Sequence, residues 1–222
     1  MYFLLVLSTV LAQTPTGPVW PNLWTVSFVE DTYSIIGINQ VYGNWYYNSV
    51  LGTSRMDRSN GRYDMFCGKN DWFSFFDTPC TQLVNNGNRY LYYPQLQICC
   101  NCCSDADGCG IVKPTWLQNA TYIGSQMYNG TIPSYNWILN GNEPNIYQET
   151  QNSDPLSRQP LELNNGPADR FMLPGAWNTS FSNSVFNVPT YCNPNYMCDT
   201  SSICGQVRGS GGKSEFLKFL RG

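Results

Sequence analysis

The segment Ile98–Cys109, which reads ICCNCCSDADGC, contains five of the ten cysteines of this 222-residue chain. Zinc sites favour CxxC pairs and histidine ligands, whereas the spacing here is CC-x-CC-x5-C and the chain has no histidine. Neighbouring cysteines bond to each other with difficulty, so each CC pair is expected to reach two distant segments. We predict that Cys67, Cys80 and the Cys192–Cys204 segment are held around this cluster, with the individual pairs left open. Disulfides are predicted for Cys67, Cys80, Cys99, Cys100, Cys102, Cys103, Cys109, Cys192, Cys198 and Cys204.

The first residues, MYFLLVLSTVLAQ, form an apolar run that is shorter than the roughly 20 residues needed to cross a bilayer. Val10 and Ala12 are small enough for a cleavage site, so residues 1–12 are predicted to be a signal peptide; a buried first strand is the alternative. Glycosylation sequons at Asn119, Asn129 and Asn178 favour the same compartment. We therefore expect a secreted glycoprotein, outside the cell or in the lumen of the secretory or lysosomal pathway, where thiols oxidise.

The chain carries few charges and many aromatic rings. Charged residues make up 12% of it, about half the usual share, and aromatic residues 15%. A net charge of −3 provides no basic surface for nucleic acid, so no nucleic-acid partner is expected. No later segment is long and apolar enough to predict a transmembrane segment. Residues 13–205 are expected to form one domain with its own core.

The local pattern along the chain is mainly that of β-strands. Two alternating runs flank Asn60-Gly61, two flank the NNGN turn at residues 85–88, and two flank Asn129-Gly130, so three hairpins are predicted. Further strands are expected at Thr25–Glu30, Asn44–Val50, Asn145–Thr150, Leu161–Leu163 and Arg170–Leu173. The sequence therefore predicts a mainly β fold, a strongly curved antiparallel sheet braced by disulfides.

Helical signals are weak by comparison. Pro114–Leu117 is expected to make one or two helical turns, because proline suits the first helical position. Residues 206–222 are predicted to be a flexible Gly-rich tail. Its apolar end around Phe216 and Leu220 leaves open a second reading, a short peptide that docks on a partner or membrane.

Catalytic patterns are largely excluded. Without histidine, Ser-His-Asp and Cys-His mechanisms are impossible, and no phosphate-binding Gly loop or nucleophile elbow is present. Acidic residues such as Asp57, Asp64, Asp105 and Asp107 lie near turns and are interpreted as solvated or turn-forming carboxylates. The SDADG segment lacks the complete ligand pattern of a calcium loop, so calcium stays only a minor alternative and no other metal or cofactor is expected. We therefore expect that the protein is not an enzyme.

Aromatic and methionine side chains recur on one face of the predicted strands. With little helix to cover it, the hollow face of a curved sheet would form an apolar pocket. The candidates for its wall are Trp45, Tyr47, Met65, Leu91, Tyr93, Ile123, Met127, Trp137 and Leu139.

Several motifs together resemble the ependymin-related proteins, in particular their cysteine-rich branch. The most specific are RMDRSNGRYD at residues 55–64 and CCNCCSDADGCGIVKPTWL at residues 99–117; WPxxWTVxF, GxWYY and VFxVPxYC accompany them between Trp20 and Cys204. The resemblance implies a secreted glycoprotein with a lipoprotein-carrier-like, half-barrel sheet whose concave side holds lipid-like ligands. It implies no enzymatic activity.

Two functions are compatible with these observations. The first is a non-enzymatic binding protein that holds a hydrophobic or lipid-like molecule in the concave pocket. The second is a structural subunit of an extracellular coat, matrix or filament, which uses the same fold for self-association. A co-purifying lipid on a monomer or dimer would favour the first, and a large assembly with an empty pocket the second.

Overall fold

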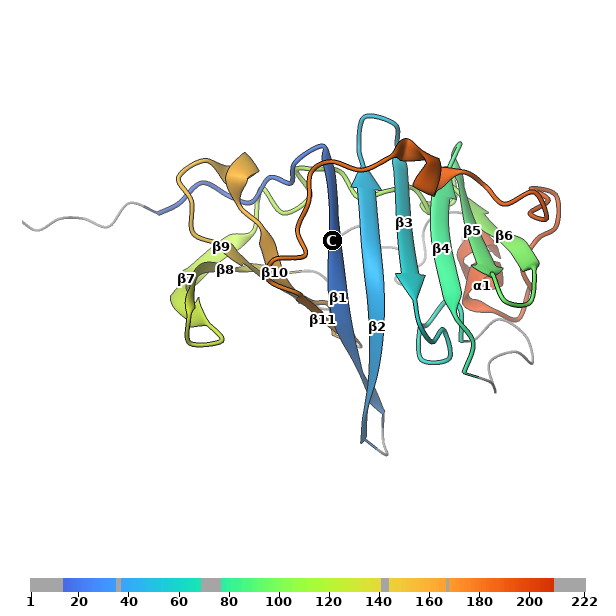
Figure 1. Cartoon of the computed structure of the whole chain (residues 1–222), viewed down its shortest axis with the longest axis horizontal. Helices are drawn as coiled ribbons and strands as arrows, with labels where there is room; N and C mark the ends of the chain where they lie inside the picture. The colour runs from blue at the N-terminus through green and yellow to red at the C-terminus, as the bar shows by residue number, and fades with distance from the viewer. Residues whose placement is uncertain (1–13, 35–36, 69–76, 141–143, 167, 210–222) are drawn as a thin grey trace, which may run out of the picture.

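The computed structural model describes residues 14–34, 37–68, 77–140, 144–166 and 168–209 (Figure 1). The predicted signal peptide and most of the predicted tail lie outside these ranges. The strands are β1 (Leu23–Ser34), β2 (Gly37–Asn48), β3 (Thr53–Arg58), β4 (Cys80–Asn85), β5 (Asn88–Tyr93), β6 (Ile98–Ser104), β7 (Thr121–Tyr128), β8 (Ile132–Leu139), β9 (Asn145–Thr150), β10 (Pro160–Asn164) and β11 (Ala168–Met172). One α-helix, α1 (Ile203–Gly209), and the short 3-10 helices η2 (Pro155–Ser157) and η3 (Asn183–Phe186) complete the described elements.

All eleven strands belong to one antiparallel sheet, in the order β6-β5-β4-β3-β2-β1-β11-β10-β9-β8-β7. The sheet is strongly curved and does not close, since β6 and β7 stand at its two edges. The predicted fold class is therefore confirmed. Strands β1 to β6 follow one another across one half, and strands β7 to β11 return across the other half until β11 pairs with β1.

This order requires a long connection across the sheet. Because β6 and β7 lie at opposite edges, residues 105–120 must cross from one side of the molecule to the other (Figure 1). The connection is held to the sheet by hydrogen bonds from the Trp20 backbone N–H to the Pro114 carbonyl (2.9 Å) and from the Tyr47 hydroxyl to the Val112 carbonyl (2.8 Å). Between it and the strands lies the main core, built around Trp20, Trp24 and Tyr47.

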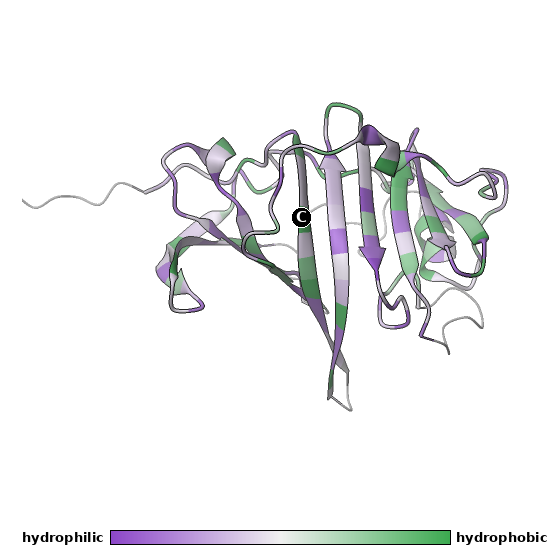
Figure 2. Ribbon diagram, viewed as in Figure 1, coloured by the Kyte–Doolittle hydropathy of each residue, from purple (hydrophilic) through white to green (hydrophobic). Residues whose placement is uncertain are grey.

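We call the sheet face beneath this connection the inner face. On β1, alternation places Trp24, Val26, Phe28 and Glu30 on it, in a row of buried side chains that ends in a charge. Figure 2 shows that β1 is hydrophobic over much of its length, whereas the end of β3, on the other side of β2, is hydrophilic. The opposite face of β4 and β5 is covered by the segment around η3, where Phe186 packs on residues such as Leu83.

The cysteines form five disulfides: Cys67–Cys80, Cys99–Cys192, Cys100–Cys198, Cys102–Cys204 and Cys103–Cys109. Neither CC pair bonds internally, as predicted, and three of the bonds attach the 192–204 segment to β6. The expectation that each CC pair reaches two distant segments is wrong, because the three distant partners all lie in residues 192–204 and Cys103 bonds to the nearby Cys109. The expected attachment of Cys67 and Cys80 to this cluster is wrong, because these two cysteines bond to each other across the loop that follows β3.

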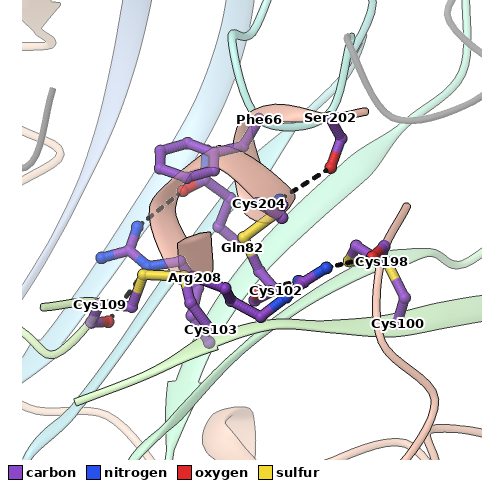
Figure 3. Close-up of a disulfide and its surroundings, with 12 residues drawn as sticks. Phe66, Gln82, Cys100, Cys102, Cys103, Cys109, Cys198, Ser202, Cys204 and Arg208 are labelled. Atoms are coloured by element: carbon purple, nitrogen blue, oxygen red, sulfur yellow. Dashed lines mark hydrogen bonds between the residues drawn. A yellow bond between two sulfur atoms is a disulfide. The ribbon is translucent and has the colours of Figure 1, made fainter. Parts of the chain in front are cut away.

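The C-terminal segment protects the edge strand β6. It adds a short parallel bridge in which Asn101 pairs with Met197, with the Asn101 N–H donating to the Tyr196 carbonyl at 2.7 Å. Helix α1 then packs over the sulfur cluster, and Arg208 donates to the Cys102 and Cys198 carbonyls (Figure 3). Pairing and coverage of an exposed edge prevent it from recruiting another chain. The helix also shows that residues 206–209, placed in the tail by the sequence, are part of the folded domain, with Val207 buried.

Two predicted hairpins are present and one is wrong. At β4–β5 and β7–β8, an Asn-Gly pair has positive φ at both positions, 48° and 72° at Asn86-Gly87 and 47° and 71° at Asn129-Gly130. Residues 62–67 do not pair with β3; they form turns, and β3 pairs with β4 instead. The Asp64 carboxylate accepts the N–H groups of Phe66 and Cys67, which favours a turn over a ladder.

The predicted helix at Pro114–Leu117 is also different in the structure. This stretch consists of successive turns, with hydrogen bonds from Trp116 N–H to Lys113 and from Gln118 N–H to Thr115. All three sequon asparagines, Asn119, Asn129 and Asn178, are exposed, so a glycan would meet no steric obstacle in the fold. No helix within the described ranges has the length and apolarity that a bilayer-spanning helix requires.

Candidate functional site

A pocket lies on the inner face, between the sheet and the β6–β7 connection. It is lined from β1–β5 on one half of the sheet and from β9–β11 on the other, which is possible because the sheet curves around it. The volume open to the centre of a water molecule is about 160 Å³, room for roughly ten waters. The pocket therefore has the size of a small-ligand site.

One part of the pocket wall is apolar and rigid. Trp20 contacts Trp45 and Trp116 edge to face, with ring centroids 5.5 Å apart in both pairs. Such contacts add about 1 kcal/mol per pair beyond the burial of area. The apolar lining consists of Trp20, Trp45, Met56, Met65, Phe66, Val84, Ile111, Val112, Trp116 and Leu163.

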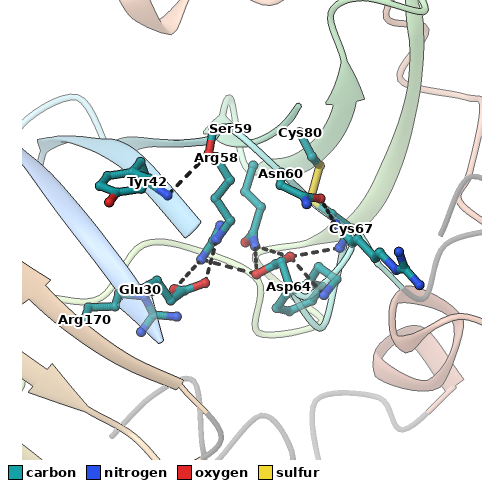
Figure 4. A network of polar contacts seen from close by, with 12 residues as sticks. Glu30, Tyr42, Arg58, Ser59, Asn60, Asp64, Cys67, Cys80 and Arg170 are labelled. Atoms are coloured by element: carbon teal, nitrogen blue, oxygen red, sulfur yellow. Dashed lines mark hydrogen bonds and ion pairs between the residues drawn. A yellow bond between two sulfur atoms is a disulfide. The ribbon is translucent and has the colours of Figure 1, made fainter. Parts of the chain in front are cut away.

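The other part of the wall is a buried ionic network centred on Glu30 (Figure 4). The Arg58 guanidinium donates to both oxygens of Glu30, from Nε at 2.9 Å and from Nη2 at 3.0 Å. Arg170, which stands directly opposite Glu30 in the β1–β11 register, forms an ion pair with the same carboxylate. Glu30 is only 1% exposed. Burial raises its pKa, but the charges of Arg170 and Arg58 outweigh burial and lower the pKa to about 2.

Arg58 and Glu30 meet because a glycine stands between them. Across β1, β2 and β3, Phe28 pairs with Gly43 and Gly43 pairs with Arg58, so the guanidinium must pass over β2 to reach β1. A Cβ atom at Gly43 would lie 2.3 Å from Phe28 Cζ and 2.4 Å from the Asp57 carbonyl oxygen. The missing side chain therefore leaves the space that the Phe28 ring occupies, and the Arg58 guanidinium lies over that ring, 5.9 Å from its centroid.

Replacement of Gly43 by alanine is expected to lower the free energy of unfolding by about 2 kcal/mol or more, because a new methyl group overpacks this crossing. Urea unfolding of G43A measures the effect. Gly209→Ala is the control, since a Cβ at Gly209 meets nothing within 4 Å. Equal stability of G43A and G209A would contradict the steric role of Gly43.

Asp64 extends the network toward β4 and β5. It forms an ion pair with Arg58 Nη2 at 3.2 Å and accepts from Gln82 Nε2 at 2.9 and 3.0 Å. The Gln82 side-chain oxygen in turn accepts from Arg89 Nη1 at 3.0 Å. Of the two predicted roles of Asp64, the turn-forming one agrees with the hydrogen bonds from the Phe66 and Cys67 N–H groups. The solvated one is wrong, because Asp64 is only 6% exposed. The turn at residues 61–68 brings it inward.

The proposed wall residues are distributed over several sites. Trp45 and Met65 line the pocket. Tyr47 and Trp137 are buried in the main core, Leu139 packs against that core, and Leu91 packs among the disulfides. Tyr93 is buried elsewhere, where its hydroxyl donates to the Cys67 carbonyl at 2.7 Å.

Ile123 and Met127 lie on the edge strand β7 and are 56% and 53% exposed. A bulge between Tyr122 and Gly124 shifts the register of this strand at Ile123. Ile123 is the unpaired residue of this bulge, which alternation along the sequence does not anticipate. Met127 stands opposite Pro133, on the same face as Trp137, but it lies at the end of the edge strand, where solvent reaches it. Neither side chain lines the pocket.

Sequence reasoning missed the charged residues of the pocket: Glu30, Arg58, Asp64, Arg89 and Arg170. The sequence carried one signal for them. Glu30 continues the alternating row of Trp24, Val26 and Phe28, at a position where an apolar residue is expected. A charge on the buried face of a strand indicates a partner on a neighbouring strand.

In the SDADG segment, Asp107 accepts hydrogen bonds from the N–H and hydroxyl of Ser104 at 2.9 and 2.7 Å. It therefore stabilises the turn that follows β6. Over the described part of the chain, no three His, Cys, Asp or Glu residues are grouped to hold a metal ion.

A second group of carboxylates lies on the opposite face of the sheet. Asp31 and Asp169 are direct cross-strand partners, and Glu162 lies on the adjacent strand. Burial and, to a smaller extent, the charge of Asp169 together raise the pKa of Glu162 to about 7. Burial also raises the pKa of Asp169.

Glu149 is a separate buried carboxylate. Burial raises its pKa to about 7, although hydrogen bonds from Arg158 and Trp137 oppose the shift.

These shifts predict that the protein is more stable in mildly acidic than in neutral solution. A carboxyl group with a raised pKa keeps its proton in the folded state after the unfolded chain has released it. The stabilisation is therefore complete below pH 4.5 and is lost as the pH rises through 7. Urea unfolding between pH 5 and pH 8 should show this loss. Glu162→Gln should remove only part of it, because Glu162 is partly exposed and solvent screens its interactions. Asp77→Asn, at an exposed carboxylate, is the control; a flat profile for the wild type would contradict the prediction.

Comparison with known proteins yields little. No protein-family model matches the chain, and no curated protein matches its sequence. Among solved structures, it is similar to an uncharacterized conserved protein from Thermus thermophilus, with a TM-score of 0.46 and 8% sequence identity, over 76% of this chain and 86% of that chain. We therefore derive the function from the residues of the pocket itself.

Proposed function

We propose that this protein is a non-enzymatic binding protein that holds a hydrophobic or lipid-like molecule in the pocket on the inner face. The observation that carries the proposal is the apolar wall, in which Trp20, Trp45 and Trp116 surround a space that the protein leaves unfilled. Cores normally pack without such space. Each CH₂ group of a ligand buried there contributes about 0.8 kcal/mol, so a short acyl chain would bind with micromolar affinity after ordering costs.

The two carboxylates of the pocket support a non-enzymatic role. Glu30 is paired with two guanidinium groups and has a lowered pKa, and Asp64 accepts from Arg58, Gln82 and two backbone N–H groups. A general base needs a free oxygen and a pKa close to the working pH. Neither carboxylate meets both requirements.

We further propose that the chain is a member of the ependymin-related family and is secreted and glycosylated. Two motifs that carry the resemblance meet at the pocket. RMDRSNGRYD supplies Met56, Arg58, Tyr63 and Asp64, and the cysteine-rich motif supplies Ile111, Val112 and Trp116. Five disulfides and three exposed sequon asparagines support an oxidising compartment.

Binding of a neutral apolar probe tests the proposed function. N-phenyl-1-naphthylamine is expected to bind the purified protein saturably, at one site and with micromolar affinity, measured by its fluorescence. Ile111→Asp, which places a charge in the apolar wall, should weaken binding at least tenfold. Ile38→Asp is the matched control, because Ile38 is 61% exposed and lies outside the pocket. Absence of saturable binding by the wild type would refute the proposal.

Self-association as a coat or filament subunit stays the alternative. It is favoured by the far ends of β1 and β2, which extend beyond the neighbouring strands (Figure 1) and expose Tyr33, Ile38 and Tyr42. Exposed apolar groups of this kind mark contact surfaces. Native mass spectrometry of protein from its natural source separates the two functions: a lipid on a monomer or dimer supports the carrier, and a large empty assembly supports the subunit.

A further inference from the structure

The polar end of the pocket has an excess of positive charge. Three guanidinium groups line it, those of Arg58, Arg89 and Arg170, against the two carboxylates of Glu30 and Asp64. The net charge of the lining is thus +1, in a site where burial makes an uncompensated charge costly.

Arg58 leaves one donor group unused. Its Nε and Nη2 atoms bond to Glu30 and Asp64, whereas Nη1 is buried and has no hydrogen-bond partner among the described residues (Figure 4). The residue is 3% exposed and lines the pocket. A buried guanidinium N–H without an acceptor is energetically unfavourable, and an acceptor in the pocket would remove this cost.

Arg89 supplies the uncompensated charge. It donates to three neutral oxygens, those of Gln82, Cys109 and Gly110, at 3.0, 3.2 and 3.2 Å. No carboxylate of the described residues forms an ion pair with it. Burial and the nearby positive charge of Arg58 together lower its pKa to about 10, although the charges of Asp64 and Asp105 oppose the shift. The charge is therefore held without a carboxylate in direct contact among the described residues.

We propose, on the basis of the binding function proposed above, that the ligand is a fatty-acid-like monoanion whose carboxylate accepts from Arg58 Nη1 and neutralises the excess charge beside Arg89. The alkyl chain then lies against the apolar wall of Met56, Trp45 and Val84. A single negative charge matches the net +1 of the lining, whereas a phosphate dianion would exceed it. The apolar wall distinguishes this site from a site for a small free anion, because such an anion has no hydrocarbon to bury against it.

Isothermal titration of the whole protein at pH 8 with decanoate, decanol, decyl phosphate and acetate tests the inference. Decanoate is expected to bind at least tenfold more tightly than decanol or decyl phosphate, and acetate to bind at least a hundredfold more weakly than decanoate. Arg89→Gln should reduce the preference for decanoate over decanol to threefold or less, and Arg89→Lys should retain most of it. Arg55→Gln is the matched control, since Arg55 lies on the other face of β3 and pairs with Asp57.

The preference within one variant is insensitive to a general loss of stability, because both ligands meet the same protein. Equal binding of decanoate and decanol by the wild type would overturn the inference while leaving the apolar binding function intact. Acetate or decyl phosphate binding as tightly as decanoate would overturn the inference too. Failure of both decanoate and decanol to bind would refute the binding function along with it.

Discussion

Glu30→Gln is expected to lower the free energy of unfolding by about 3–5 kcal/mol, because it removes one partner of a buried ionic network. The glutamine leaves Arg170 without its carboxylate and Arg58 with Asp64 alone. Arg58 and Glu30 are almost fully buried, so water cannot replace the lost contacts. Equilibrium urea unfolding at pH 7, followed by tryptophan fluorescence, measures the loss.

Asp57→Asn provides the comparison for Glu30→Gln. Asp57 pairs with Arg55 at 2.9 Å on the other face of the sheet, where both side chains are about a quarter exposed. A pair of this kind contributes at most about 1 kcal/mol. If E30Q lost no more stability than D57N, the network on the inner face would not be a structural element of the fold.

Removal of the Cys102–Cys204 disulfide by serine substitution is expected to cost about 3 kcal/mol. The bond spans 102 residues, but Cys100–Cys198 already links the same two segments in the unfolded chain. The additional loop that Cys102–Cys204 closes therefore has only about 8 residues, which in the chain-entropy account contributes about 2.5 kcal/mol. The bond also holds α1 against Phe66 and Leu91, so part of a buried cluster is expected to open with it. Unfolding in denaturant measures the first effect, and hydrogen exchange of residues 203–209 measures the second.

The Cys103–Cys109 disulfide is a control on the same strand. It closes a loop of only 6 residues, for which the same account gives about 2 kcal/mol. C103S/C109S should therefore lose a similar amount of loop entropy, but it should leave the exchange of α1 unchanged, because neither cysteine lies on that helix. Equal exchange of residues 203–209 in the two variants would contradict the role of Cys102–Cys204 in holding α1.

The parts of the structure that the sequence predicted correctly depend on neighbours along the chain. The Asn86-Gly87 and Asn129-Gly130 turns are examples, because asparagine and glycine adopt positive φ with little strain and thus specify the hairpin locally. The β9 strand is another, and its predicted bounds, Asn145–Thr150, agree with the structure. Where a local pattern was disturbed, the prediction failed, as at the bulge beside Ile123 and in the turn held by Asp64.

The sequence alone determines that this chain is a β protein and predicts that its cysteines are oxidised, because alternation, turn residues and the CC-x-CC cluster are local properties. Tertiary structure decided which cysteines pair, which side chains line the pocket, and that Arg58 reaches Glu30 across Gly43. These contacts join residues from strands far apart along the chain, and they exist only because β6 and β7 take opposite edges and β11 closes on β1. Strand order follows from the packing of the whole sheet, and no local periodicity contains that information.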